Sequence, residues 1–132
     1  MMSTKSLSKE LVDHYQEILL EEKRQTQKII DGLIITLEQG RKEQTGDLSS
    51  YSVHQADLGT DTYTMENNVF ILEKEQKKMA QINAALKRIY EGTYGICPIT
   101  GKQISLQRLD AIPWALYSAE AKLDEEKKHS NV

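Results

Sequence analysis

The chain has 132 residues, of which 17 are basic and 20 acidic, giving a formal net charge of -3 and a pI near 5.6. This length suits one domain, with or without an extended appendage. A content of 39% hydrophobic and 28% charged residues suits long solvated helices better than a large compact core. The negative charge argues against a nucleic-acid backbone as the main partner, because that affinity comes from clustered Lys and Arg.

The sequence pattern disfavours secretion and membrane insertion. No apolar segment follows residues 1–8, no run of 18 apolar residues occurs, and the chain has a single cysteine. We therefore expect a cytoplasmic protein that is neither secreted nor inserted in a membrane.

The first predicted helix covers residues 7–39, which include one glycine and no proline. Ser6 or Ser8 is a suitable N-cap, and Gly40 is a suitable end. Apolar residues recur every three or four positions, although this stripe weakens between residues 21 and 28. The stripe consists of Leu11, Tyr15, Ile18, Ile29, Leu33 and Leu37.

The second predicted helix begins after Thr62 and ends at Glu91, where Gly92 supplies a C-terminal stop. Its apolar residues alternate steps of three and four, which is heptad spacing, with the polar Gln76 between two of them. They are Met65, Val69, Leu72, Met79, Ile82, Leu86 and Ile89.

Two apolar stripes of similar length predict an antiparallel helical hairpin, because each stripe is the nearest cover for the other. A compact helical bundle is the alternative that this pattern leaves open. The linker, residues 41–61, is rich in Gly, Ser, Asp and Thr and would form the tip of the hairpin. We expect a helical domain over residues 1–92 and a small C-terminal domain over residues 93–132.

A cysteine-containing segment follows the second helix. It reads Tyr-Gly-Ile-Cys-Pro-Ile-Thr-Gly-Lys over residues 94–102 and Arg-Leu-Asp-Ala-Ile-Pro over residues 108–113. From about residue 84 to residue 122 the chain resembles the zinc-finger half of the DksA/TraR family of bacterial transcription factors. The resemblance implies a mainly α fold: a long antiparallel coiled-coil hairpin, a small globular lobe carrying the zinc-finger-like segment, and a C-terminal helix.

The zinc module of that family uses four cysteines in two Cys-x-x-Cys pairs. Here Cys97 is the only cysteine, and the resemblance places the other ligand positions at Thr100, Ser118 and Ala121. Hydroxyl groups are poor zinc ligands and a methyl group is none, so we expect a degenerate module without zinc. Apolar packing would replace the metal. The last helix is expected to start near Pro113, and the side chains expected to pack on the lobe are Trp114, Leu116, Tyr117 and Leu123.

Residues 49–61 resemble the coiled-coil tip of the same family, in forms with a Ser-Ser-Tyr-Asp-x-His-x-Ala-Asp pattern. Asp57 matches the second tip aspartate, whereas Ser52 occupies the first acidic position. Asp47 or Asp61 is expected to keep negative charge nearby. The resemblance implies a monomeric protein that binds bacterial RNA polymerase through its secondary channel, with the tip residues Asp57 and Asp61 acting near the active site.

The resemblance also raises the question of a nucleotide ligand, because some family members bind guanosine tetraphosphate at their interface with polymerase. The corresponding positions are Lys74, Gln81 and Lys122. Both lysines suit phosphate, but Gln81 lacks the charge. Binding of this nucleotide is left open.

Other readings of the same residues are weaker. A helical stress or interaction protein with a different protein partner is the alternative function. An enzyme is disfavoured, since no nucleophile–base pair is visible, and sequence-specific DNA binding is not expected. His54 beside Asp57 is more typical of a solvated loop than of a metal site, and a buried cysteine is the default for Cys97. The pairs Lys77-Lys78 and Lys87-Arg88 are expected on solvated helix faces.

Overall fold

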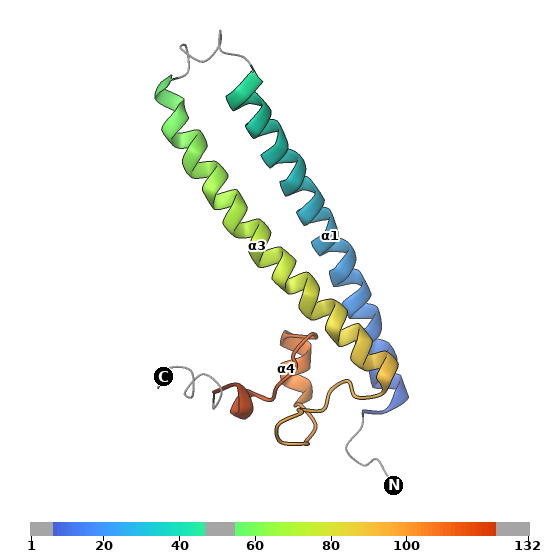
Figure 1. The fold of residues 1–132 in the computed structure, drawn as a ribbon. Coiled ribbons are helices and arrows are strands. Elements are labelled where there is room, and N and C mark those ends of the chain that lie inside the picture. The colour runs from blue at the N-terminus through green and yellow to red at the C-terminus, as the bar shows by residue number, and fades with distance from the viewer. Residues whose placement is uncertain (1–6, 47–54, 124–132) are drawn as a thin grey trace. The chain divides into compact units, whose positions relative to one another are not determined.

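A computed structural model describes residues 7–46 and 55–123, with side chains described for residues 7–42 and 63–123. Its main helices are α1 (Lys9–Gly46), α3 (Gln55–Glu91) and α4 (Leu106–Ala111) (Figure 1). Within the described ranges no extended strand forms; Ile96 and Gln103 make an isolated antiparallel bridge. The predicted fold class, mainly α with a long helix pair, is confirmed. Among the described helices, none is long and apolar enough to cross a membrane.

The chain divides into two compact units. Unit 1 combines Met1–Lys23 with Ala80–Val132, and unit 2 is Arg24–Met79. This division differs from the boundary expected at residue 92, because the start of α1 and the end of α3 both belong to unit 1.

Unit 2 is an antiparallel pair made by α1 and α3, which lie side by side (Figure 1). A Cβ placed on Gly40 would lie 3.6 Å from Met65 Sδ, which fixes how the two helices are aligned. If residues are counted along both helices from this contact toward unit 1, Leu37 lies opposite Asn68 and Leu33 lies opposite Leu72. The next two pairs are Ile30 with Glu75 and Thr26 with Met79. All ten residues of these five layers are buried or half-buried.

The apolar seam of unit 2 differs in detail from the predicted stripes. Ile29 is 46% exposed and Val69 is 40% exposed, and their neighbours Ile30 and Asn68 face the seam instead. Gln76 is exposed, and Glu75 takes the place between Leu72 and Met79. The reason is geometric: an antiparallel seam follows alternating steps of three and four from its closest contact, whatever the polarity of the residue on each step.

Unit 1 contains the hydrophobic core. It is built from the start of α1, the end of α3 and the segment that follows α3. Its buried members are Leu7, Tyr15, Leu19, Ile82, Ala85, Tyr94, Cys97, Ile104, Leu109, Ala115 and Ala121. Trp114 and Tyr117 pack against this cluster as expected, whereas Leu116 is only half-buried and Leu123 is 58% exposed.

The helix ends follow local hydrogen bonding. Ser8 Oγ accepts from the Leu11 amide at 3.2 Å, as an N-cap does, and Gly92 ends α3 with a φ of 80°. The predicted loop over residues 41–61 is too long, because α1 continues through residues 41–46 and α3 begins at Gln55. Gly40 does not end α1, which continues to Gly46; it lies against Met65 in the seam, where an added Cβ would make an ordinary contact at 3.6 Å.

Two elements near the C-terminus also differ from expectation. Ser105 caps the unpredicted helix α4 by accepting from the Arg108 amide at 3.2 Å. The final helix does not begin at Pro113: residues 112–117 are non-helical, and helix starts at residue 119. Ser118 caps this turn, with its Oγ 3.2 Å from the Ala121 amide and its carbonyl 2.9 Å from the Lys122 amide.

Candidate functional site

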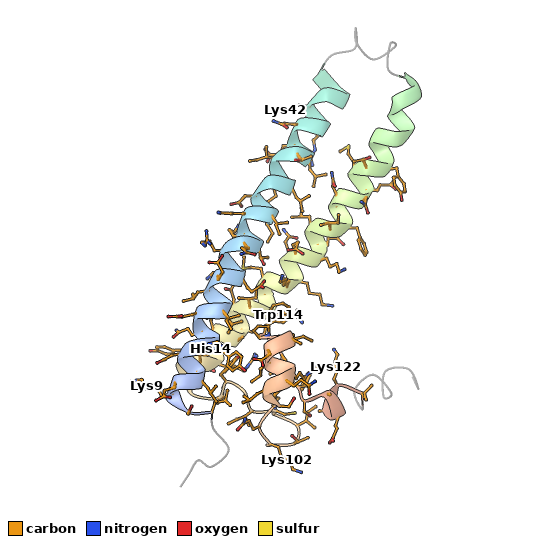
Figure 2. All side chains as sticks on the ribbon, turned by 180° about the vertical axis from the view of Figure 1, so that it is seen from behind. Lys9, His14, Lys42, Lys102, Trp114 and Lys122 are labelled. Carbon is orange, nitrogen blue, oxygen red and sulfur yellow. The ribbon has the colours of Figure 1, made fainter. Side chains whose placement is uncertain are left out.

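The cysteine loop, residues 97–102, forms a tight turn. The Gly101 amide donates to the Cys97 carbonyl at 2.8 Å, and the Cys97 amide donates to the Lys102 carbonyl at 2.9 Å. Gly101 has a φ of 72°, a conformation that a side chain would strain. Figure 2 shows Lys102 projecting from the outer end of this loop. The turn is therefore held by backbone hydrogen bonds.

The thiol of Cys97 is fully buried and lies among hydrogen-bond donors. Burial raises its pKa, but hydrogen bonds from the backbone of Ser118, from the backbone and hydroxyl of Thr100, and from the backbone of Ile99 lower it more, to about 6. Cys97, Thr100 and Ser118 thus lie together, and Ala121 is buried in the same core.

These residues do not fit a zinc ion. One thiol, two neutral hydroxyls and a methyl group do not supply the closed set of four ligands that a structural zinc site requires. Over the described residues, no group of three His, Cys, Asp or Glu side chains is placed to hold a metal. The hydrogen-bond donors around Cys97 favour a negative charge on its sulfur, which is why its pKa is lowered.

Residues 112–117 are held by side chains that donate to their carbonyl groups. Tyr94 Oη donates to the Pro113 carbonyl at 2.7 Å, and Arg108 Nε donates to the Tyr117 carbonyl at 2.8 Å. Arg88 reaches the carbonyls of residues 114 and 115 at 3.4 and 3.3 Å. This explains why the segment is not helical, because its carbonyls are satisfied without intrahelical bonds.

Arg88 is the residue that sequence reasoning misplaced. The pair Lys87-Arg88 was expected on a solvated face; Lys87 is exposed, but Arg88 is half-buried. Burial lowers the pKa of its guanidinium group. A signal was available, because Arg88 lies three residues after Ala85, on the buried side of α3.

A second link joins the start of α1 to α4. Tyr15 Oη donates to Asp110 Oδ1 at 2.6 Å. Burial, and then the hydrogen bond and the negative charge of Asp110, raise the pKa of Tyr15 to about 12. Burial also raises the pKa of Tyr94, whose ring lies 6.1 Å from that of Tyr15. Both tyrosines are therefore neutral hydrogen-bond donors at physiological pH.

The expected tip residues lie at the start of α3. Asp57 and Asp61 are the third and seventh residues of this helix, which begins at Gln55. Ser52, His54 and Asp47 lie outside the described residues. The backbone thus places both expected aspartates in the first two turns of a helix.

The proposed nucleotide positions are divided between the units. Lys74 lies in unit 2, whereas Gln81 and Lys122 lie in unit 1, and all three side chains are exposed. Lys122 belongs to the helical turn at residues 119–123, where Figure 2 shows it on the lobe. Because the two lysines belong to different units, neither unit alone forms a site that contains both.

Comparison with known families gives a match over the lobe. Residues 92–127 match the prokaryotic dksA/traR C4-type zinc finger. Over 122 residues the chain is 33% identical to general stress protein 16O of Bacillus subtilis, a match covering 92% of this chain and 72% of that protein. It is 29% identical to the RNA polymerase-binding transcription factor DksA of Caulobacter vibrioides, covering 86% of this chain and 70% of the relative.

A further relative shows that such matches can be partial. The chain is 40% identical over 75 residues to the uncharacterized protein YteA of Bacillus subtilis, and this stretch is 57% of the chain but only 31% of the length of YteA. Among solved structures, transcription factor DksA2 from Pseudomonas aeruginosa is similar with a TM-score of 0.78 and 28% identity, covering 98% of this chain and 94% of that one. The chain therefore belongs to the DksA/TraR family.

Proposed function

We propose that this protein is a cytoplasmic transcription regulator that binds bacterial RNA polymerase and is not an enzyme. The observation that carries the proposal is the likeness to transcription factor DksA2, which extends over 98% of the chain with a TM-score of 0.78. A relative that matches 86% of the chain is named an RNA polymerase-binding transcription factor. The proposal concerns the whole fold, and the absence of cysteine at Thr100, Ser118 and Ala121 does not weaken it.

The proposed mechanism uses the helix pair as an arm that enters the secondary channel of polymerase. Asp57 and Asp61, in the first two turns of α3, would then lie at its leading end. A carboxylate there can act on charged groups near the polymerase active site, since charges interact strongly where water is excluded. Affinity would come from the helical stem and the lobe.

The test measures polymerase binding separately from the effect on transcription. Asp57→Asn removes one charge and keeps the side-chain shape, and the Asp57→Asn, Asp61→Asn double variant removes two. Both should keep the melting temperature and polymerase binding of the unchanged protein, and both should lose most of its effect on promoter-complex lifetime in transcription in vitro. Asp13→Asn is the matched control, because Asp13 is an exposed acid of α1 in unit 1.

Two outcomes would count against this assignment. Full regulatory activity of the double variant would contradict the role of the tip, and failure of the unchanged protein to bind polymerase would contradict the partner itself. We also propose that the protein acts as a monomer without direct sequence-specific DNA contacts. Light scattering, and anisotropy with promoter DNA in the absence of polymerase, measure these two properties.

Lys74 and Lys122 are proposed as phosphate contacts for guanosine tetraphosphate in the complex with polymerase. Their exposed ammonium groups suit this role, and the neutral Gln81 weakens it. Transcription with and without the nucleotide should show a small response that Lys122→Ala abolishes and Gln81→Lys increases. No change in either variant would remove the nucleotide from the proposal.

A second candidate is a stress protein that keeps this fold but binds another protein. The observation in its favour is the relative named general stress protein 16O, which matches 92% of the chain. A pull-down from bacterial lysate, with this protein as bait, discriminates the two candidates because it shows whether RNA polymerase is retained. Retention of a different protein, with no polymerase, would favour the second.

A further inference from the structure

The seam of unit 2 contains polar atoms without a hydrogen-bond partner among the described residues. Thr26 is only 1% exposed, and its Oγ1 forms no hydrogen bond among the described residues. Glu75 is half-buried, and its Oε1 is likewise inaccessible and without a hydrogen bond there. A buried polar atom without a partner is destabilising, because it has given up its hydrogen bonds to water.

These two residues occupy neighbouring layers of the seam. The contact of Gly40 with Met65 sets the alignment, which pairs Ile30 with Glu75 and Thr26 with Met79. Successive layers are about one helical turn apart, roughly 6 Å along the axis. Both defects therefore lie at one end of unit 2, and we call these two pairs the polar layers.

Apolar burial in the rest of the seam compensates only in part for these unpartnered polar atoms. Leu33, Leu37 and Leu72 are only half-buried, and Ile30 is the one fully buried apolar side chain among the described residues of unit 2. Each helix segment depends on its partner, because most helical stability in proteins comes from the packing of an apolar face rather than from helix propensity. Loss of contact at the polar layers would therefore also expose backbone amides.

We propose that the polar layers are a built-in weak point at which α1 and α3 separate locally while unit 1 stays folded. The polar side chains keep the pairing specific but lower its strength, as single polar residues do in coiled-coil seams. The separation is a conformational property of the free protein. It requires neither polymerase nor any nucleotide.

The test replaces each polar group by an apolar one of similar size. Thr26→Val removes the hydroxyl and keeps the branched shape, and Glu75→Leu removes the carboxylate. Thr36→Val and Glu73→Leu make the same exchanges at exposed positions of the same helices, so that changes in helix propensity cancel. Hydrogen exchange of the backbone amides, measured by mass spectrometry, and thermal unfolding are the readouts.

We expect Thr26→Val to slow amide exchange by roughly 5- to 30-fold in residues 24–35 and 68–79, and to raise the apparent melting temperature of unit 2 by several degrees. Glu75→Leu should act in the same direction. Both control variants should leave exchange in these segments within about twofold of the unchanged protein, as exposed substitutions do.

Two results would overturn the proposal. Faster exchange or lower stability in Thr26→Val would mean that the hydroxyl is satisfied in solution and supports the pairing. Equal slowing in residues 82–89 of unit 1 would mean that the molecule opens only as a whole. Glu75→Met keeps an unbranched side chain of similar length without the polar oxygen atoms, and it gives the same information if Glu75→Leu does not fit the seam.

Discussion

The two compact units are stabilised by different means. Every member of the buried hydrophobic cluster lies in unit 1, whereas the described side chains of unit 2 include only two that are fully buried, Thr26 and Ile30. Unit 1 also has the tyrosine and arginine hydrogen bonds to residues 112–117. A single long helix therefore belongs to a densely packed unit at one end and to a sparsely packed pair at the other, and its local stability is expected to follow local burial.

The largest expected effect comes from removing a side chain of the unit 1 core. Ile82 is 0% exposed, and Ile82→Ala should cost about 2–5 kcal/mol of unfolding free energy. Leu33→Ala, at a half-buried position in unit 2, should cost roughly 1 kcal/mol. Urea unfolding measures both. Equal losses would mean that the units do not differ, and Ile82→Val replaces Ile82→Ala if that variant does not fold.

A smaller effect should follow the loss of one buried hydroxyl. Tyr94→Phe leaves the Pro113 carbonyl without its donor at 2.7 Å and should cost about 1–3 kcal/mol. Tyr90→Phe is the matched control, because Tyr90 is 92% exposed and should give no measurable change. If the two variants unfold alike in urea, the hydrogen bond does not hold residues 112–117.

The Cys97 thiol should make the stability of unit 1 depend on pH. Its pKa is about 6 when folded against an ordinary value of 9.0, so between these values the unfolded chain binds a proton that the folded chain does not. The contribution of this thiol to the unfolding free energy is fully present above pH 9 and is lost as the pH falls toward 6. The difference in unfolding free energy between the unchanged protein and Cys97→Ser should therefore grow from pH 6 to pH 9. A constant difference would show that the thiol stays neutral.

The smallest expected effect is that of a chelator. Because the ligand positions Thr100, Ser118 and Ala121 supply no thiolate, EDTA should leave the melting temperature of the protein unchanged. Elemental analysis after growth in zinc-supplemented medium should find far less than one zinc per chain. A stoichiometric zinc ion that is lost together with folding would contradict the view that hydrogen bonds and packing hold the lobe.

The sequence allowed the helix pair to be predicted because the apolar steps from Met65 to Ile89 hold over several heptads. The polar members of the seam were missed, since periodicity counts apolar residues and passes over Thr26 and Glu75. Helix ends were less predictable: Gly40 resembles a stop signal, but its partner Met65 lies far away in the sequence.

The lobe was predictable in kind rather than in detail. The tight turn after Cys97 and the burial of this residue follow from the motif. The carbonyl groups of residues 114 and 115 accept hydrogen bonds from Arg88, which is distant in sequence. Arginine is also a residue type that is usually found on the surface. Long-range hydrogen bonds of this kind leave no local pattern, so the start of the last helix was placed too early.

The contact between Leu7 and Gly95 has a consequence for biosynthesis. A Cβ on Gly95 would lie 2.6 Å from Leu7 Cδ1, so the turn at Gly95 closes directly onto the chain before α1. Tyr15 likewise bonds to Asp110, 95 positions later. Unit 1 therefore cannot assemble on the ribosome until its second half has emerged. At a synthesis rate of roughly 5–20 residues per second, the apolar face of residues 7–23 stays exposed for on the order of ten seconds. Chaperone binding would protect the nascent chain most during this interval.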